Sequence, residues 1–251
     1  MADSKFLSFY VWKGMDLVKN PKRILQLPAV TGRLLLSFTA LELRSFSQRK
    51  GAKLISSFIS KANARSIRVE LLLGEPSWVM DIYRPRLFEL LDYVREIPFD
   101  GFHFDIERSQ LPAYEQTTWS EGIVRVAAEM NQWLDTKFRA RVPIGFSVHH
   151  RDLADSVFVD GFRNNGNPEI VAMVYVANPI SAQHTMLTAQ LRSGPYPNLS
   201  IAVSIEEALP EEESTFKRGR LESLDQWVTF NCLWNTSVVV QSFEDYMKAE
   251  L

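Results

Sequence analysis

The chain has 251 residues, of which 46% are hydrophobic and 23% are charged, a composition typical of a globular protein. Its net charge of -2 argues against nucleic acid or an anionic membrane as the main partner. The single cysteine, Cys232, excludes an internal disulfide, and no run approaches the roughly 18 apolar residues of a membrane helix. Because the first residues lack a basic region and a small-residue cleavage site, we expect a cytoplasmic protein, or a secreted one if a signal preceded this sequence.

Eight short segments rich in apolar, β-branched or aromatic residues predict β-strands. They cover residues 6–12, 33–38, 67–73, 99–107, 142–149, 170–176, 199–205 and 237–241. Apolar periodicity predicts helices at 53–64, 85–95, 120–138, 156–163, 181–191, 221–233 and 243–251, with a polar loop at 209–220. Alternating strands and helices favour one (β/α)8 TIM barrel over residues 1–251. An open doubly wound sheet would place a glycine-rich phosphate turn after the first strand, and none is present there.

The segment 99–107, FDGFHFDIE, carries the most informative pattern. In an extended chain its three titratable residues, His103, Asp105 and Glu107, fall on one face, and its apolar residues fall on the other. Two carboxylates so close raise each other's cost of ionisation, so one of them is expected to hold a proton near neutral pH. A purely structural strand has little use for such a pair, whereas a general acid needs a proton at this pH.

Active sites of TIM barrels lie at the carboxyl ends of the strands, where further polar and aromatic side chains follow the predicted segments. We expect Glu107, Asp105, Glu206 and Tyr175 to be catalytic, and Trp78, Glu75, His149, Asn178, Gln241 and His103 to bind substrate. Acids and aromatic rings around one mouth suit a sugar, because pyranose faces stack on aromatic rings while hydroxyl groups need hydrogen-bond partners. The sequence therefore predicts a carbohydrate substrate, with no cofactor and no metal ion, and leaves the oligomeric state open.

The stretch 100–107, DGFHFDIE, resembles the DGxDxDxE signature on the fourth strand of the chitinase-like glycoside hydrolases, family 18. The resemblance implies that Glu107 is the general acid and that Asp105 orients the N-acetyl group of the substrate. The chain departs from this pattern at His103, which stands where the family has an Asp. On the sixth strand, Met173 and Tyr175 resemble the Met-x-Tyr-Asp of the family, with a valine in place of the final Asp.

The sequence is also similar to uncharacterised bacterial barrels regarded as glycoside hydrolases, and to the wider clan of retaining glycosidases. That second layout implies Glu107 as acid/base after strand 4 and Glu206 as nucleophile after strand 7, although Ile106 stands where the clan usually has Asn. A retaining mechanism requires the two carboxyl groups about 5 to 5.5 Å apart, and an inverting one requires about 6.5 to 9.5 Å.

Other interpretations remain open at this point. A metal-dependent hydrolase is the first of them. One divalent ion could bind the imidazole of His103 and the carboxylates of Asp105 and Glu107, with His149 from the next strand. The barrel could also bind glycan without catalysis. In purely structural interpretations, the two carboxylates form a buried ion pair with Arg108, Arg151 or a base of a neighbouring strand. His103 is then a core residue with a hydrogen bond to Asp105 or Tyr175. Trp12 and Trp78 would then serve packing.

Overall fold

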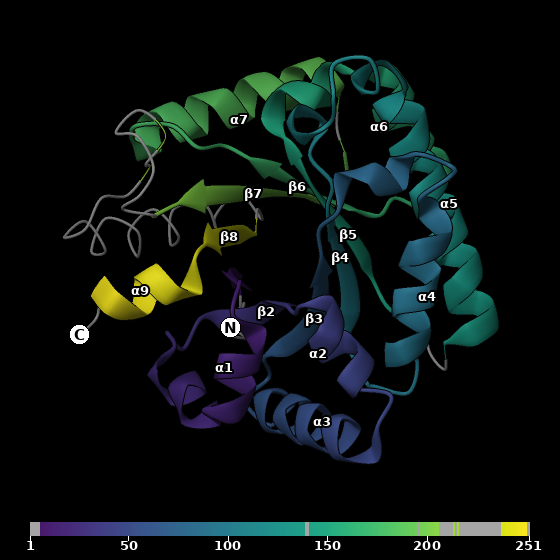
Figure 1. Ribbon diagram of the computed structural model, residues 1–251. Helices are drawn as coiled ribbons and strands as arrows, with labels where there is room; N and C mark the ends of the chain where they lie inside the picture. The colour runs from purple at the N-terminus through teal and green to yellow at the C-terminus, as the bar shows by residue number, and fades with distance from the viewer. Residues whose placement is uncertain are drawn as a thin grey trace.

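The structure is a computed structural model, and it describes residues 6–138, 141–194, 196–205, 213, 215 and 237–249. Eight parallel strands close into a barrel in the order β1 to β8, and β1 also pairs with β8 (Figure 1). The strands are β1 Leu7–Val11, β2 Thr31–Ser37, β3 Arg68–Leu73, β4 Gly101–Asp105, β5 Ile144–His149, β6 Glu169–Met173, β7 Leu199–Ser204 and β8 Val238–Gln241. The predicted (β/α)8 TIM barrel is confirmed, and each strand overlaps its predicted segment.

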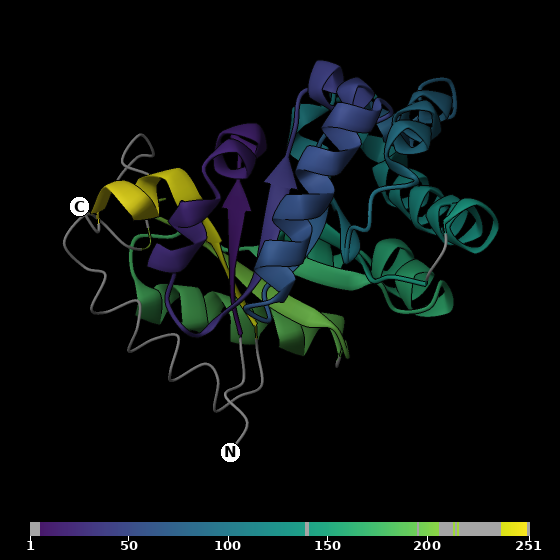
Figure 2. The same cartoon turned by 90° about the horizontal axis from the view of Figure 1, so that it is seen from below.

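Helices cover the outside of the barrel, as Figures 1 and 2 show. They are α1 Gly14–Lys19, α2 Ala40–Ser45, α3 Arg49–Asn63, α4 Arg84–Val94, α5 Trp119–Lys137, α6 Ser156–Asn164, α7 Pro179–Ser193 and α9 Phe243–Ala249. The predicted helix at 221–233 and nearly all of the loop at 209–220 lie outside the described residues. None of the described helices is long and apolar enough to cross a membrane.

Two of these helices, α1 and α2, were not predicted, because each has only six residues and shows little periodicity. Helix α2 nevertheless carries a capping box at its start. The Thr39 side chain accepts a hydrogen bond from the Glu42 amide, and the Glu42 carboxylate accepts one from the Thr39 amide at 2.8 Å. The T-x-x-E spacing is thus a local signal for the helix start that periodicity alone does not supply.

The strands bury apolar side chains on both faces, which divides the core into two clusters. The larger one lies between the strands and the surrounding helices. The smaller one fills the middle of the barrel and consists of Tyr10, Leu35, Leu72, Val171, Met173, Ala202 and Val239, with Tyr175 packed against it. Polar residues also lie inside the barrel, and Ser147 joins the hydroxyl of Tyr10 in the small cluster to the His103 imidazole.

Strand β4 is anchored from outside by aromatic packing. Its outward Phe104 stacks on Phe146 of β5 with ring centroids 5.1 Å apart. Just beyond the strand, the buried indole of Trp119 at the start of α5 donates a hydrogen bond to the Ile106 carbonyl at 3.0 Å. Ile106 is itself fully buried. These contacts fix the backbone on both sides of the inward-facing carboxylates.

Candidate active site

The two carboxylates of the β4 signature lie at the carboxyl end of the barrel. Asp105 is the last residue of β4, and its Oδ1 is buried without a hydrogen-bond partner among the described residues. Glu107 precedes the short 3-10 helix Arg108–Gln110 and accepts hydrogen bonds from Gln110 Nε2 at 2.6 Å and from Ser109 Oγ at 3.5 Å. Asp105 is therefore the more enclosed of the two, and Glu107 is the one held at the surface of the mouth.

Burial is the main cause of the electrostatics of this pair. Burial, with a smaller contribution from the charge of Glu107, raises the pKa of Asp105 to about 7. Burial also raises the pKa of Glu107, against the lowering effect of its hydrogen bonds to Gln110 and Ser109. Asp105 therefore keeps a proton up to near neutral pH, which the spacing of the two carboxylates predicted.

A third carboxyl group lies nearby, at the end of β5. Burial raises the pKa of Asp152 to about 6, with a small further increase from the charge of Glu107, while Arg108 lowers it. Arg108 Nη1 lies 3.9 Å from Asp152 Oδ1 and 3.7 Å from Asp155 Oδ2. Among the described residues Arg108 therefore pairs with these two aspartates, and the structural reading that pairs it with Asp105 or Glu107 is wrong.

Two stacked histidines form the wall next to Asp152. The rings of His149 and His150 have centroids 4.2 Å apart. His149 Nδ1 accepts a hydrogen bond from the Arg151 amide at 3.2 Å, and His150 Nδ1 donates one to the Met173 carbonyl at 3.1 Å. Burial, followed by the neighbouring His150 and Arg151, lowers the pKa of His149 to about 4. His149 is thus a neutral ring at the mouth, able to donate from Nε2.

His103 lies one layer deeper, inside the barrel. It is fully buried, and its Nε2 is 2.8 Å from Ser147 Oγ, which also contacts the hydroxyl of Tyr10. His103 is therefore a core residue, but its hydrogen-bond partner is Ser147 rather than the predicted Asp105 or Tyr175. Burial lowers the pKa of His103 to about 3, so the ring is neutral. Its depth also removes it from the mouth as a direct substrate contact.

The proposed metal row does not form. Within the ranges that the structure describes, one group of potential metal ligands comes together, and it joins His103 to Glu70 and Glu169 at the other end of the barrel. Asp105 and Glu107 are not part of it. Because the imidazole turns away from the two carboxylates, the row His103, Asp105 and Glu107 cannot hold one ion.

The remaining predicted site residues are spread around the mouth. Trp78 is 4% exposed and shares with Glu75 the lining of a cavity of about 320 Å³ at the ends of β2 and β3. Glu75 also accepts a hydrogen bond from the Ser77 amide. Asn178 caps α7 by accepting from the Ser181 amide at 2.9 Å. The ring of Trp78 is therefore packed rather than open to a sugar.

The last three predicted site residues are Tyr175, Gln241 and Glu206. Tyr175 is partly buried against the inner cluster. Gln241 ends β8, and its Oε1 is buried without a hydrogen-bond partner among the described residues. Glu206 lies outside the described residues, so the separation of the Glu107 and Glu206 carboxyl groups stays a prediction.

Sequence reasoning undervalued Trp12, which follows β1 at the mouth. Its ring is 37% exposed and stacks on Tyr10 at 5.6 Å with an interplanar angle of 8°. The signal was available, because Ser8, Tyr10 and Trp12 alternate along one face of the first strand. An exposed indole held by a second ring is the kind of platform on which a sugar face stacks.

Neither a protein-family model nor a curated protein sequence matches this chain. Solved structures do resemble it. The glycoside hydrolase domain of PgaB (BpsB) from Bordetella bronchiseptica is 11% identical with a TM-score of 0.59, covering 97% of this chain and 96% of that one. D-psicose 3-epimerase, solved in the presence of D-fructose, is 9% identical with a TM-score of 0.56, covering 97% and 89%. A xylose isomerase domain protein from Planctomyces limnophilus is 13% identical with a TM-score of 0.55, covering 98% and 93%.

At these identities the likeness establishes the fold. The protein is a TIM barrel whose carboxyl-end mouth carries three carboxyl groups with raised pKa values, from Asp105, Glu107 and Asp152. Function must be argued from that site.

Proposed function

We propose that the protein is a glycoside hydrolase acting on an oligosaccharide or polysaccharide, with Glu107 as the general acid. The observation that carries the proposal is the desolvated pair Asp105 and Glu107 at the carboxyl end of β4, where both pKa values are raised. Cleavage of a glycosidic bond needs a proton for the leaving oxygen, and a carboxyl with a raised pKa supplies it near physiological pH. The fold-level likeness to a glycoside hydrolase domain is compatible with this reaction.

The two carboxyl groups have different roles in this proposal. Glu107, whose carboxylate is bound by the exposed Gln110, touches the substrate and donates the proton. Asp105 is a positioning residue, because its buried Oδ1 disfavours a charge there. A neutral Asp105 leaves no second negative charge beside the carboxylate that forms when Glu107 gives up its proton. The pair therefore favours the charge distribution that exists after proton transfer.

A second carboxylate completes a glycosidase, and we propose Glu206 for it, as nucleophile, on the layout of the retaining enzymes. If the reaction instead uses an N-acetyl group of the substrate, Asp105 orients that group and Glu206 is dispensable. Around the pair, Trp12 offers the stacking platform, while His149 and Gln241 offer polar contacts to sugar hydroxyls. The metal-dependent hydrolase is not proposed further, because its ligand row does not converge.

The test uses glycosides with different leaving groups. Glu107→Gln should lower kcat on alkyl glycosides and natural oligosaccharides by about 10²- to 10⁴-fold, the range for loss of a general acid. Dinitrophenolate leaves without a proton, so the same variant should keep most of its kcat/KM on dinitrophenyl glycosides. The control is Glu89→Gln on the exposed side of α4, which should behave like wild type.

Equal loss on both classes of substrate would move Glu107 to the nucleophile. Wild-type turnover by Glu107→Gln on an alkyl glycoside would refute the assignment. A wild-type chain that binds oligosaccharide but cleaves none of the tested glycosides would show an inactive glycan-binding barrel.

A further inference from the structure

The amino ends of the strands hold a second polar cluster, which includes neither Asp105 nor Glu107. Arg33 of β2, Glu70 of β3 and Glu169 of β6 point into this end of the barrel, with His103 of β4 just above them. Arg33 is 3% exposed and Glu70 is 1% exposed. Ionisable side chains buried this deeply need partners, so their hydrogen bonds can be counted one by one.

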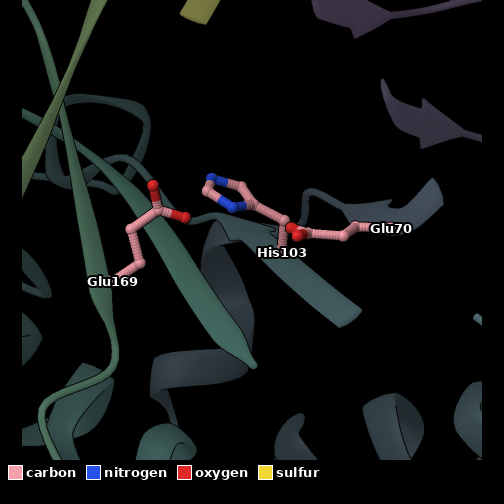
Figure 3. A group of neighbouring side chains, drawn as sticks. All are labelled: Glu70, His103 and Glu169. Atoms are coloured by element: carbon pink, nitrogen blue, oxygen red, sulfur yellow. The ribbon is translucent and has the colours of Figure 1, made fainter. Parts of the chain in front are cut away.

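That count leaves two buried atoms without hydrogen-bond partners among the described residues. They are Nδ1 of His103 and Oε1 of Glu70. One potential ligand atom from each of Glu70, His103 and Glu169 lies within 4.8 Å of the others. Figure 3 shows the Glu169 carboxylate directed at the imidazole from one side and the Glu70 side chain reaching it from the other. Both atoms without partners therefore belong to one convergent group.

The hydrogen bond on the far side of the ring is compatible with the tautomer that metal binding at Nδ1 requires. Nε2 lies 2.8 Å from Ser147 Oγ, so an Nε2–H can donate to that hydroxyl and leave the lone pair on Nδ1 free. Metal-bound histidines are held in this way, by a hydrogen bond from the ring nitrogen that does not bind the ion.

Two features give this group space and access. A β-carbon at Gly145 would lie 2.4 Å from His103 Nδ1 and 3.2 Å from Glu169 Oε2, so glycine at this position keeps the approach to both atoms open. A cavity of about 630 Å³ is lined by Arg33, Glu70 and Glu169 and opens at the amino end of the barrel. An ion can reach the cluster from solvent by this route.

The two carboxylates of the cluster are not paired equally well. Arg33 binds both oxygens of Glu169, with Nη2 3.0 Å from Oε1, but its contact to Glu70 is 3.5 Å long. Glu70 also forms an ion pair with Arg68, whose Nη2 is 3.7 Å from Oε1 and whose side chain is 55% exposed, so both ion pairs of Glu70 are long. Burial raises the pKa of Glu70 despite the opposing charge of Arg33, as expected for an incompletely paired acid.

We propose that Glu70, His103 and Glu169 form a binding site at the amino end of the barrel for one divalent metal ion such as Zn²⁺ or Mn²⁺. One imidazole nitrogen with two carboxylates suits these ions better than Mg²⁺ or Ca²⁺, which prefer oxygen ligands throughout. The ligands are His103 Nδ1, a Glu70 oxygen and Glu169 Oε2, and water from the cavity completes the shell.

Arg33 is the built-in competitor for this ion. Binding requires Arg33 Nη1 to leave Glu169 Oε2, while Nη2 stays on Oε1 and Nε stays on Ser8 at 3.1 Å. A bound ion would link β3, β4 and β6, so the role proposed for it is structural. The proposal does not depend on glycosidase activity, and its readout is binding.

The test titrates chelator-treated, full-length protein with Mn²⁺, followed by electron paramagnetic resonance, and with Zn²⁺, followed by calorimetry and thermal unfolding. Wild type should bind one ion per chain and unfold at a higher temperature when loaded. Glu70→Gln should weaken binding at least tenfold, and Arg33→Met should tighten it at least tenfold because the competing guanidinium is gone. Glu89→Gln and the double variant His149→Gln/His150→Gln, which test surface binding, should bind like wild type.

If Arg33→Met does not fold alone, Zn²⁺ should restore its circular dichroism spectrum, and failure to do so would count against the site. The proposal is overturned if wild type and Arg33→Met show no saturable binding, or if binding survives Glu70→Gln. Loss of binding in the double histidine variant would assign the ion to the mouth and overturn the proposal equally.

Discussion

Replacing Asp105 with Asn should stabilise the protein in a pH-dependent way. Asp105 has a pKa of about 7 in the folded chain against an ordinary value of 3.8, mainly because of burial. The folded state therefore holds a proton that the unfolded state has released, and stability falls as pH rises from about 4 to about 7. The difference of roughly three pKa units corresponds to at most about 4 kcal/mol, at 1.36 kcal/mol per unit.

Asp105→Asn removes this titration and keeps the shape of the side chain. Urea unfolding at pH 4 and pH 8 measures the effect: the variant should match wild type at pH 4 and exceed it by up to about 4 kcal/mol at pH 8. Asp135→Asn, on the exposed side of α5, serves as the control and should show no such difference. If Asp105→Asn gave the same change in stability at both pH values, or lost stability at pH 8, Asp105 would not be a desolvated carboxyl.

Three further predictions follow from the same geometry. Glu107→Gln should lower the pKa of Asp105, because a neighbouring charge is lost, and leave it above 3.8, because the side chain stays buried. Carbon-13 NMR titration measures this pKa, and an unchanged value would contradict the contribution of the Glu107 charge. Wild-type kcat/KM should fall on the alkaline side through the raised pKa of Glu107, whereas activity that rises on that side contradicts an acid role. Trp119→Phe leaves the buried Ile106 carbonyl unpaired, so urea unfolding should show a loss of about 1 to 3 kcal/mol, and an unchanged midpoint would mean the bond contributes nothing.

The fold was predictable because the barrel imposes a local pattern on each strand. Strand β4 alternates residues for its two faces, so Phe104 and Asp105 could be assigned opposite directions from sequence alone. The regular spacing of eight such segments then sufficed for the closed barrel. Short elements such as α1 and α2 depend on caps and on packing against their neighbours, which periodicity does not register.

The site was predictable only in part. The contribution of the Glu107 charge to the raised pKa of Asp105 follows from a spacing of two residues, which is visible in the sequence, whereas the larger contribution of burial depends on the closed barrel. The environment of His103 is not local, because its hydrogen-bond partner Ser147 is 44 residues away. The ion pair of Arg33 with Glu169 spans 136 residues, and only the closed register of the barrel brings them together. No pattern within one segment could have located that cluster.

Barrel closure also bears on how the chain folds during synthesis. The pairing of Leu7 in β1 with Val238 in β8 joins residues near the two ends of the chain. A ribosome that has delivered the first seven strands has therefore made a sheet with two open edges, each able to pair with another chain. Such a nascent sheet is exposed to aggregation until β8 emerges, and chaperone occupancy should be greatest in that interval. The pairing of β8 with β1 and β7 therefore covers both open edges and removes these sites of aggregation.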